Sequence, residues 1–202
     1  MPREYPSSMI RTLGICAALV ANAAAAPLPS GRAAQAMLSD AHRFTHLRSF
    51  RMHQVEVTPV GTTVKDVTYV APDKVRVVLG DTGLIVVVIS KNVWLRGPDG
   101  KWTKANLPPG DDVVDIVRNT TAFADDLRDK AVTALGPRQL AGAPTRLYEV
   151  DERRKAGYSV KTTFVWIGTA DGYAHRIEER NGPYVSTTTY SDWNQPLSVS
   201  VP

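Results

Sequence analysis

One stretch, residues 158–201, decides the fold. It reads YSVKTTFVWI (158–167), GTADG (168–172), YAHRIEER (173–180), NG (181–182), PYVSTTTYS (183–191) and DWNQPLSVSV (192–201). It holds four extended runs, the last being PLSVSV at 196–201. The separators GTADG, NG and SDWNQP supply the glycine, asparagine, aspartate or proline that a backbone reversal requires. A period of two places Phe164 and Trp166 on one face of the first run, and Lys161 and Thr163 on the other. The stretch therefore predicts an antiparallel meander.

The region before this meander is also dominated by strand patterns. Extended runs are predicted at 49–58, 62–70, 75–79, 84–89, 93–95, 131–135 and 145–150, with turns at 59–61, 71–74, 80–83, 97–102 and at Gly136 and Pro137. Trp94 and Trp102 are expected to lie near each other across one hairpin. The run LIVVVI (84–89) is apolar throughout. It predicts a strand buried on both faces, or one with a face that borders a cavity for an apolar ligand.

Two regions have helical patterns. Residues 33–47 carry apolar side chains at helical spacing, with Leu47 one position out of register, and they predict an amphipathic helix. His42 and His46 lie four apart on it without an acidic residue that could serve as a general base, so we expect them to be solvated. Residues 111–117 and 120–128 predict a short helical insertion that covers one face or the open end of the sheet.

Residues 1–25 have the layout of a secretory signal. Arg3 and Arg11 precede an apolar stretch at 13–20, and an alanine-rich tract follows it. The apolar stretch is shorter than the ~20 residues that span a bilayer. We predict cleavage after Ala23 or Ala25 and a single mature domain at 26–202. Because Cys16 is the only cysteine, the mature chain is expected to have no disulfide and no thiolate metal site.

Composition and missing motifs exclude several classes of function. The formal net charge is +4, but no run of Lys and Arg is interleaved with aromatic residues, so nucleic-acid binding is not expected. The chain has no GxSxG, P-loop, GxGxxG or HExxH motif, and His175 stands alone in its strand. We therefore predict a protein that is not an enzyme, with no catalytic residues, no metal and no cofactor.

Five motifs in a fixed order resemble the LolA/LppX superfamily of envelope lipid and lipoprotein carriers. They are SFRM (49–52), APDKVRV (71–77), VWLRGPDGKW (93–102), FVWIGTADGYAHRIE (164–178) and TTYSDWNQP (188–196). The resemblance implies an α+β fold, in which an antiparallel, incomplete β-barrel (a half-barrel) wraps around an N-terminal helix and a short helical insertion. Carriers of the LolA type proper have an arginine before the proline of the APDK turn, where this chain has Ala71. The chain therefore resembles the wider LolA-like group.

The same resemblance implies a function. We expect a monomeric, periplasmic carrier that does not span the membrane and binds a lipid, or the acyl chain of a lipoprotein, in an apolar cavity. A buried methylene contributes ~0.8 kcal/mol, so an acyl chain needs no charged pocket for useful affinity. The expected cavity-lining residues are Phe44, Leu47, Val77, Leu79, Val87, Ile89, Trp94, Phe164 and Trp166.

An envelope protein-interaction or sensor module without lipid cargo is the alternative function. Trp193 and the surrounding SDWNQP segment (191–196) are expected to be exposed, which would suit a surface that binds an envelope protein.

Overall fold

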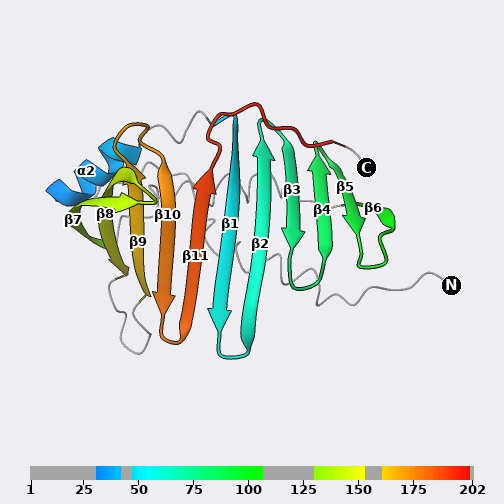
Figure 1. The fold of residues 1–202 in the computed structure, drawn as a ribbon, viewed down its shortest axis with the longest axis horizontal. Coiled ribbons are helices and arrows are strands. Elements are labelled where there is room, and N and C mark those ends of the chain that lie inside the picture. The colour runs from blue at the N-terminus through cyan, green and yellow to red at the C-terminus, as the bar shows by residue number, and fades with distance from the viewer. Residues whose placement is uncertain (1–30, 42–46, 107–129, 153–160, 201–202) are drawn as a thin grey trace.

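The computed structural model describes residues 31–41, 47–106, 130–152 and 161–200, which form one antiparallel sheet of eleven strands with a helix beside it (Figure 1). The helix is α2 (Arg32–Ala41). The strands are β1 (Ser49–Thr58), β2 (Gly61–Val70), β3 (Lys74–Leu79), β4 (Leu84–Ile89), β5 (Asn92–Arg96), β6 (Trp102–Asn106), β7 (Lys130–Leu140), β8 (Ala143–Glu152), β9 (Lys161–Gly168), β10 (Ala174–Asn181) and β11 (Tyr184–Ser191).

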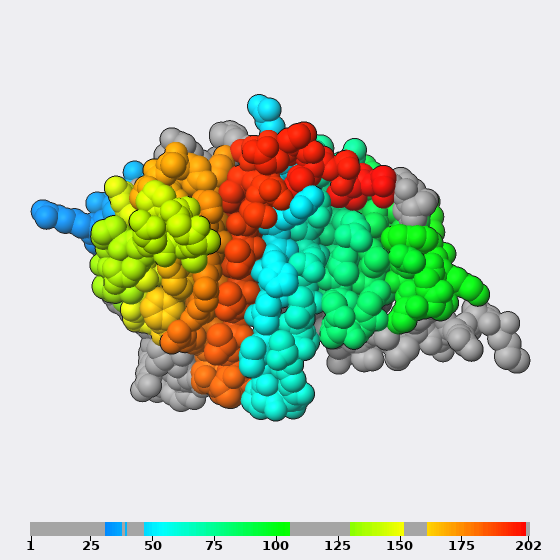
Figure 2. Space-filling model, viewed as in Figure 1, coloured from blue at the N-terminus to red at the C-terminus, as the bar shows by residue number. Residues whose placement is uncertain are grey.

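The strand order is β6-β5-β4-β3-β2-β1-β11-β10-β9-β8-β7, so the sheet consists of two meanders joined at the middle. All pairs but one join strands that are consecutive in the sequence, and the exception is the antiparallel pair β1–β11. These two strands lie side by side along the middle of the molecule (Figure 2). The edge strands β6 and β7 are not paired with each other, so the sheet is unclosed, as an incomplete barrel requires.

The predicted turns between strands are confirmed at three hairpins. Thr58 pairs with Gly61 across the first, and Gly182 adopts a φ of 58° between β10 and β11. In the GTADG turn, the N–H of Gly168 donates to the carbonyl oxygen of Tyr173 at 2.9 Å. A Cβ atom at Gly168 would lie 2.3 Å from Oδ1 of Asp171 and 2.6 Å from Nε2 of His175, so a larger residue there would displace both side chains.

The predicted turn at Gly136 and Pro137 is wrong. Strand β7 continues through both residues to Leu140, with a bulge between Ala134 and Gly136, and the chain reverses instead at Ala141 and Gly142, which have positive φ. Because β7 is an edge strand, one side of its backbone needs no ladder partner, and a bulge accommodates glycine and proline there.

Two other predicted elements end differently in the structure. Helix α2 covers Arg32–Ala41, whereas Leu47 is not helical and packs against the core next to β1. The run PLSVSV adds no strand to the sheet in its described part. The reason is that β11 already pairs with β1 on one side and β10 on the other, so a following strand finds no open position beside β11.

Some sequence predictions lie outside the described residues. They are the signal at 1–25, Phe44 with His42 and His46, and the helical insertion at 111–128. Within the described parts, α2 is too short and not apolar enough to qualify as a membrane-crossing helix.

The segment SDWNQP packs over the junction of β1 and β11. The ring of Trp193 stacks on Tyr173 and Tyr190 with centroid distances of 4.8 and 5.4 Å, and it lies 5.4 Å from Phe50. Only 9% of Trp193 is exposed, so the expectation of an exposed tryptophan is wrong. The residues on either side, Asp192 and Asn194, adopt left-handed φ values of 55° and 56°, which reverse the chain and turn the indole inward.

Polar contacts hold the same segment against the start of β1. The N–H of Asn194 donates to the carbonyl oxygen of Ser49 at 2.8 Å, and Oδ1 of Asn194 accepts from the N–H of Arg48 at 2.7 Å. Its Nδ2 donates to the hydroxyl of Tyr173 at 2.6 Å. Asn194 therefore connects the beginning of β1 to the loop before β10.

Replacing the buried tryptophan should weaken the whole sheet. We expect Trp193→Ala to lower the free energy of unfolding by about 3–5 kcal/mol, because it removes a large buried ring from the central junction. Trp102→Ala is the matched control, since 39% of Trp102 is exposed, and it should cost less than about 1 kcal/mol. Urea unfolding of both variants measures the difference. Equal midpoints for the two variants would contradict the assigned role of Trp193.

Candidate functional site

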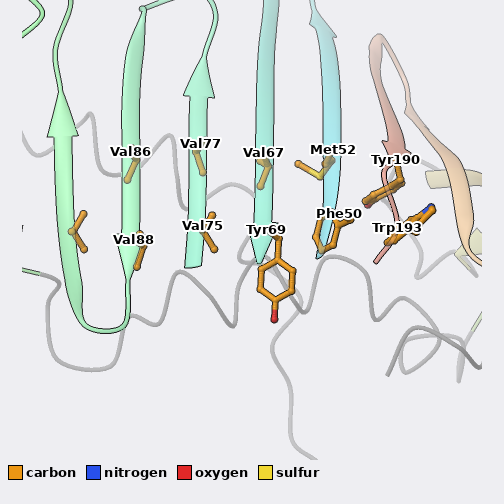
Figure 3. Close-up of a cluster of buried hydrophobic side chains, with 11 residues drawn as sticks. Phe50, Met52, Val67, Tyr69, Val75, Val77, Val86, Val88, Tyr190 and Trp193 are labelled. Carbon is orange, nitrogen blue, oxygen red and sulfur yellow. The ribbon is translucent and has the colours of Figure 1, made fainter. Parts of the chain in front are cut away.

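One face of the sheet, here called the core face, carries the larger group of buried apolar side chains (Figure 3). On β3, β4 and β5 the register aligns Val77, Val86 and Leu95 in one row. Side chains opposite each other in an antiparallel ladder share a face, so these rows form a continuous apolar surface. The larger core cluster consists of Phe50, Met52, Val67, Tyr69, Val75, Val77, Val86, Val88, Val93, Tyr190 and Trp193.

A smaller core cluster lies on the other half of the sheet. It comprises Met37, Tyr148, Val150, Val165, Ile167 and Ala174, and Met37 reaches it from α2 with no exposed surface. Ile177 packs against both clusters. In the ladder, Ile177 stands opposite Thr188, and Thr188 stands opposite Gln54 on β1. Gln54 points to the same face as Met52 of the larger core cluster, because side chains alternate along the strand. Both clusters are therefore on the same face of one sheet.

The nine expected cavity residues do not share this face. Val77, in the larger core cluster, and Leu47 and Leu79, which pack against it, lie on the core side. Since side chains alternate along a strand, Val87, Ile89 and Trp94 lie on the opposite face of β4 and β5, and Phe164 and Trp166 lie on that face of β9. Phe44 is outside the described residues. One cavity on the core side cannot be lined by all nine.

The aromatic residues of β9 are covered by arginines. The guanidinium of Arg176 lies 5.1 Å from the ring centroid of Trp166, and that of Arg180 lies 5.2 Å from the centroid of Phe164. Guanidinium groups stack favourably on aromatic faces. Sequence reasoning placed these aromatics in an interior, but the arginines two residues on either side of Glu178 were an available signal that this face is polar.

Glu178 connects the two arginines. Its Oε2 accepts from Arg176 Nη2 at 2.6 Å, and its Oε1 accepts from Arg180 Nε and Nη2 at 2.8 and 2.6 Å. Only 7% of the residue is exposed. Burial alone would raise the pKa of Glu178, but the hydrogen bonds from Arg180 and Arg176 and their positive charges outweigh it and hold the pKa below its ordinary value. The carboxylate is therefore charged at neutral pH.

Strand β4 is apolar toward both faces, as its sequence predicted. Val86 and Val88 point to the core face, Val87 points to the opposite face, and each is at most 2% exposed. On the opposite face Val87 stands between Arg76 of β3 and Trp94 of β5. The neighbouring side chains bury it there.

The described residues contain no group of three or more His, Cys, Asp or Glu arranged to hold a metal ion. Their two histidine–carboxylate pairs are His53 with Asp66 at 2.7 Å and His175 with Asp171 at 2.9 Å. His175 bonds to the turn that contains Gly168, so its contact supports the β9–β10 hairpin.

Comparisons with known proteins support the fold. No family model and no curated protein sequence matches the chain. Among solved structures, lipoprotein LppX from Mycobacterium tuberculosis is 17% identical with a TM-score of 0.58 and covers 85% of this chain and 100% of its own. LprF from Mycobacterium bovis is 14% identical with a TM-score of 0.63, covering 87% and 99%.

A third similar structure is the complex of MucA and MucB from Pseudomonas aeruginosa. The matched chain is 13% identical with a TM-score of 0.50, and the alignment covers 80% of this chain but 56% of that one. At these identities the comparisons describe the fold. The chain shares the fold of LppX and LprF, as the resemblance of its motifs implied.

The ion pairs of Glu178 should make part of the stability depend on pH. We expect Glu178→Gln to lower the free energy of unfolding at pH 7 by about 1–3 kcal/mol, the smaller values allowing for partly exposed arginines. Because the folded-state pKa is below the ordinary value of 4.5, this contribution is complete above about pH 4.5 and is lost as the pH falls through the folded-state pKa.

Unfolding by urea at several pH values measures this effect. The difference between the wild type and Glu178→Gln should shrink in acid. Glu179→Gln is the control, because the side chain of Glu179, which pairs with Lys161 at 2.7 Å, is 39% exposed against 10% for Glu178, so this substitution should change the stability little. A difference that stays constant down to pH 2 would argue against the ion pairs as its source.

Proposed function

We propose that this protein binds a lipid, or the acyl chain of a lipoprotein, against the core face of its open sheet and carries it in the periplasm. The observation that supports this most is the pair of apolar clusters on the core face, which Ile177 connects, present on a fold shared with LppX and LprF. In this proposal the sheet wraps as a half-barrel around the N-terminal helix and the helical insertion, after residues 1–25 have been removed as a signal.

The border of the larger core cluster is the part best suited to receive a ligand. Leu79 and Leu84 stand opposite each other at the β3–β4 hairpin, Leu95 stands in the row of Val86, and all three are partly buried. A partly buried leucine still has apolar surface to cover, whereas Val75 and Val88 are at most 1% exposed. An acyl chain that covers such surface gains ~0.8 kcal/mol per methylene.

Among the nine residues expected from the sequence, three lie on the core side or pack against its cluster, namely Val77, Leu79 and Leu47. Leu79 and Leu47 are partly buried, and we keep them as ligand-binding candidates, whereas Val77 is only 2% exposed and lies beneath the proposed lining. Val87, Ile89, Trp94, Phe164 and Trp166 point to the opposite face, so they are not part of the proposed site.

Photo-crosslinking with a fatty acid that carries a diazirine in its chain tests the proposal. We expect labels on the core-face residues of β3–β5, such as Leu79, Leu84 and Leu95, and none on the alternate residues such as Ile85 and Val87. Peptide mass spectrometry at residue resolution reads the pattern, because the two sets alternate along the same strands. Labels mainly on the alternate set, or no saturable labelling, would refute the proposed site.

A matched pair of substitutions on β4 gives an independent test. Leu84 and Ile85 are adjacent and partly buried, but only Leu84 packs against the larger core cluster. We expect Leu84→Gln to weaken binding of a fluorescent fatty acid at least about fivefold, corresponding to ~1 kcal/mol of lost apolar contact, and Ile85→Gln to change it less than about twofold. Equal effects of the two substitutions would count against the core face as the ligand site.

A protein-interaction module without lipid cargo is the second candidate function. The likeness to the chain matched in the MucA/MucB complex favours it, whereas buried Trp193 no longer does. Native mass spectrometry of the chain purified from the periplasm without detergent separates the two functions. A bound mass in the range of a fatty acid or phospholipid supports the carrier, and a lipid-free chain that also takes up no fluorescent lipid supports the module.

A further inference from the structure

On β3–β6, basic side chains gather on the face of the sheet that is opposite the core face. In the ladder, Arg76, Val87, Trp94 and Lys104 form one row of opposed residues across the four strands. Lys74 stands opposite Ile89, and Arg96 stands opposite Trp102, on the same face. We call this surface the basic face, and define it by Lys74, Arg76, Arg96, Lys104, Trp94 and Trp102.

Within the described part of the chain, this surface carries no carboxylate. Strands β3–β6 contain four basic residues and no aspartate or glutamate. Among the described residues that adjoin these strands, Asp73, Asp81 and Asp99 lie in the turns, and Asp66 on β2 pairs with His53 at 2.7 Å. The other half of the sheet differs, because there the same face carries Glu149 and Glu178 alongside its arginines.

The basic side chains of the basic face lie beside apolar residues of the same face. Val87 is only 2% exposed although it points away from the core face, so its neighbours cover it. The ammonium group of Lys104 lies 5.9 Å from the ring centroid of Trp94. Arg76, Arg96 and Lys104 are exposed, and 39% of Trp102 is exposed. Long basic side chains lie along apolar surface in this way and keep their charges in water.

We propose that the basic face docks onto an anionic lipid bilayer surface. Acidic headgroups complement a surface that has four cations and no carboxylate, with each Lys or Arg near such a surface contributing about fivefold in affinity, from ~1 kcal/mol. Tryptophan is favoured at the depth of the headgroups because its ring is amphipathic. The site lies on the face away from the proposed acyl-chain site, so it stands independently of that function.

Vesicle co-sedimentation of the lipid-free protein tests the proposal. Vesicles of phosphatidylcholine alone are compared with vesicles of phosphatidylcholine and phosphatidylglycerol in equal parts. We expect binding only to the anionic vesicles, weakened by added salt. The triple variant Arg76→Gln, Arg96→Gln, Lys104→Gln should bind on the order of 100-fold more weakly. Uptake of an acyl chain would not distinguish the two headgroups, so failure of this test leaves the carrier function standing.

The triple variant Lys130→Gln, Arg138→Gln, Arg146→Gln is the matched control. It removes the same charge from β7 and β8, at the other edge of the sheet, and should keep most of the binding. Unfolding midpoints establish that both triples fold. Bromine-labelled phosphatidylglycerol should quench wild-type fluorescence, and Trp102→Phe should reduce that quenching.

Three outcomes would overturn the proposal. The first is that the wild type does not bind anionic vesicles. The second is that the two triple variants lose vesicle binding equally. The third is that a soluble polyglutamate peptide displaces the protein from the vesicles and binds it with the same affinity per charge as the bilayer. The last result would assign the basic face to an acidic protein partner.

Discussion

The pairing of β1 with β11 is the interaction on which the sheet depends. Each half of the sheet is a series of hairpins, and the two halves meet in one ladder that runs from Arg51 opposite Ser191 to Val57 opposite Val185. A slip of one residue in this ladder would turn the side chains of one half to the other face. The two core clusters would then no longer share a face. Trp193 and Asn194 oppose such a slip, because they bind both β1 and the loop before β10.

Alternation along the strands gives the sheet two chemically different faces. The core face carries an apolar cluster on each half, whereas the opposite face carries arginine and lysine over aromatic rings. Strand β4 is apolar on both sides, and Val87 is buried on the face away from the core, where it stands between Arg76 and Trp94 in the ladder. One open sheet can therefore offer a surface for an apolar ligand and a separate surface for a charged one.

The sequence predicted the strands well where turn residues were unambiguous. The hairpins at Gly61, Gly168 and Gly182 follow from local backbone chemistry, so local reading was sufficient. It failed at Gly136, where an edge position tolerates glycine and proline, and at PLSVSV, because β11 before it is paired on both sides. Edge positions are a property of the whole sheet, which a local pattern does not contain.

The candidate site was harder to predict than the fold for a related reason. The alternation of side chains along a strand shows that Trp166 and Val165 point to opposite faces of the sheet, but it does not show which of them points to the core. Large aromatics suggested the interior, yet the arginines of β10 made Trp166 compatible with the polar face. The inward position of Trp193 depends on left-handed backbone at Asp192 and Asn194, which residue type alone did not reveal.

The position of β1 beside β11 also has a consequence for how the chain folds. Spatial order along the sheet would equal sequence order if the chain began at β7, continued from Gln195 into Arg48, and ended at β6. The two segments that this connection would join are already in contact, since Ser49 Oγ donates to the carbonyl oxygen of Gln195 at 2.5 Å. A rearranged chain with this connection, which would omit α2, would have lower contact order, and lower contact order is associated with faster folding. In the natural order, the central ladder is the step that closes the longest loop.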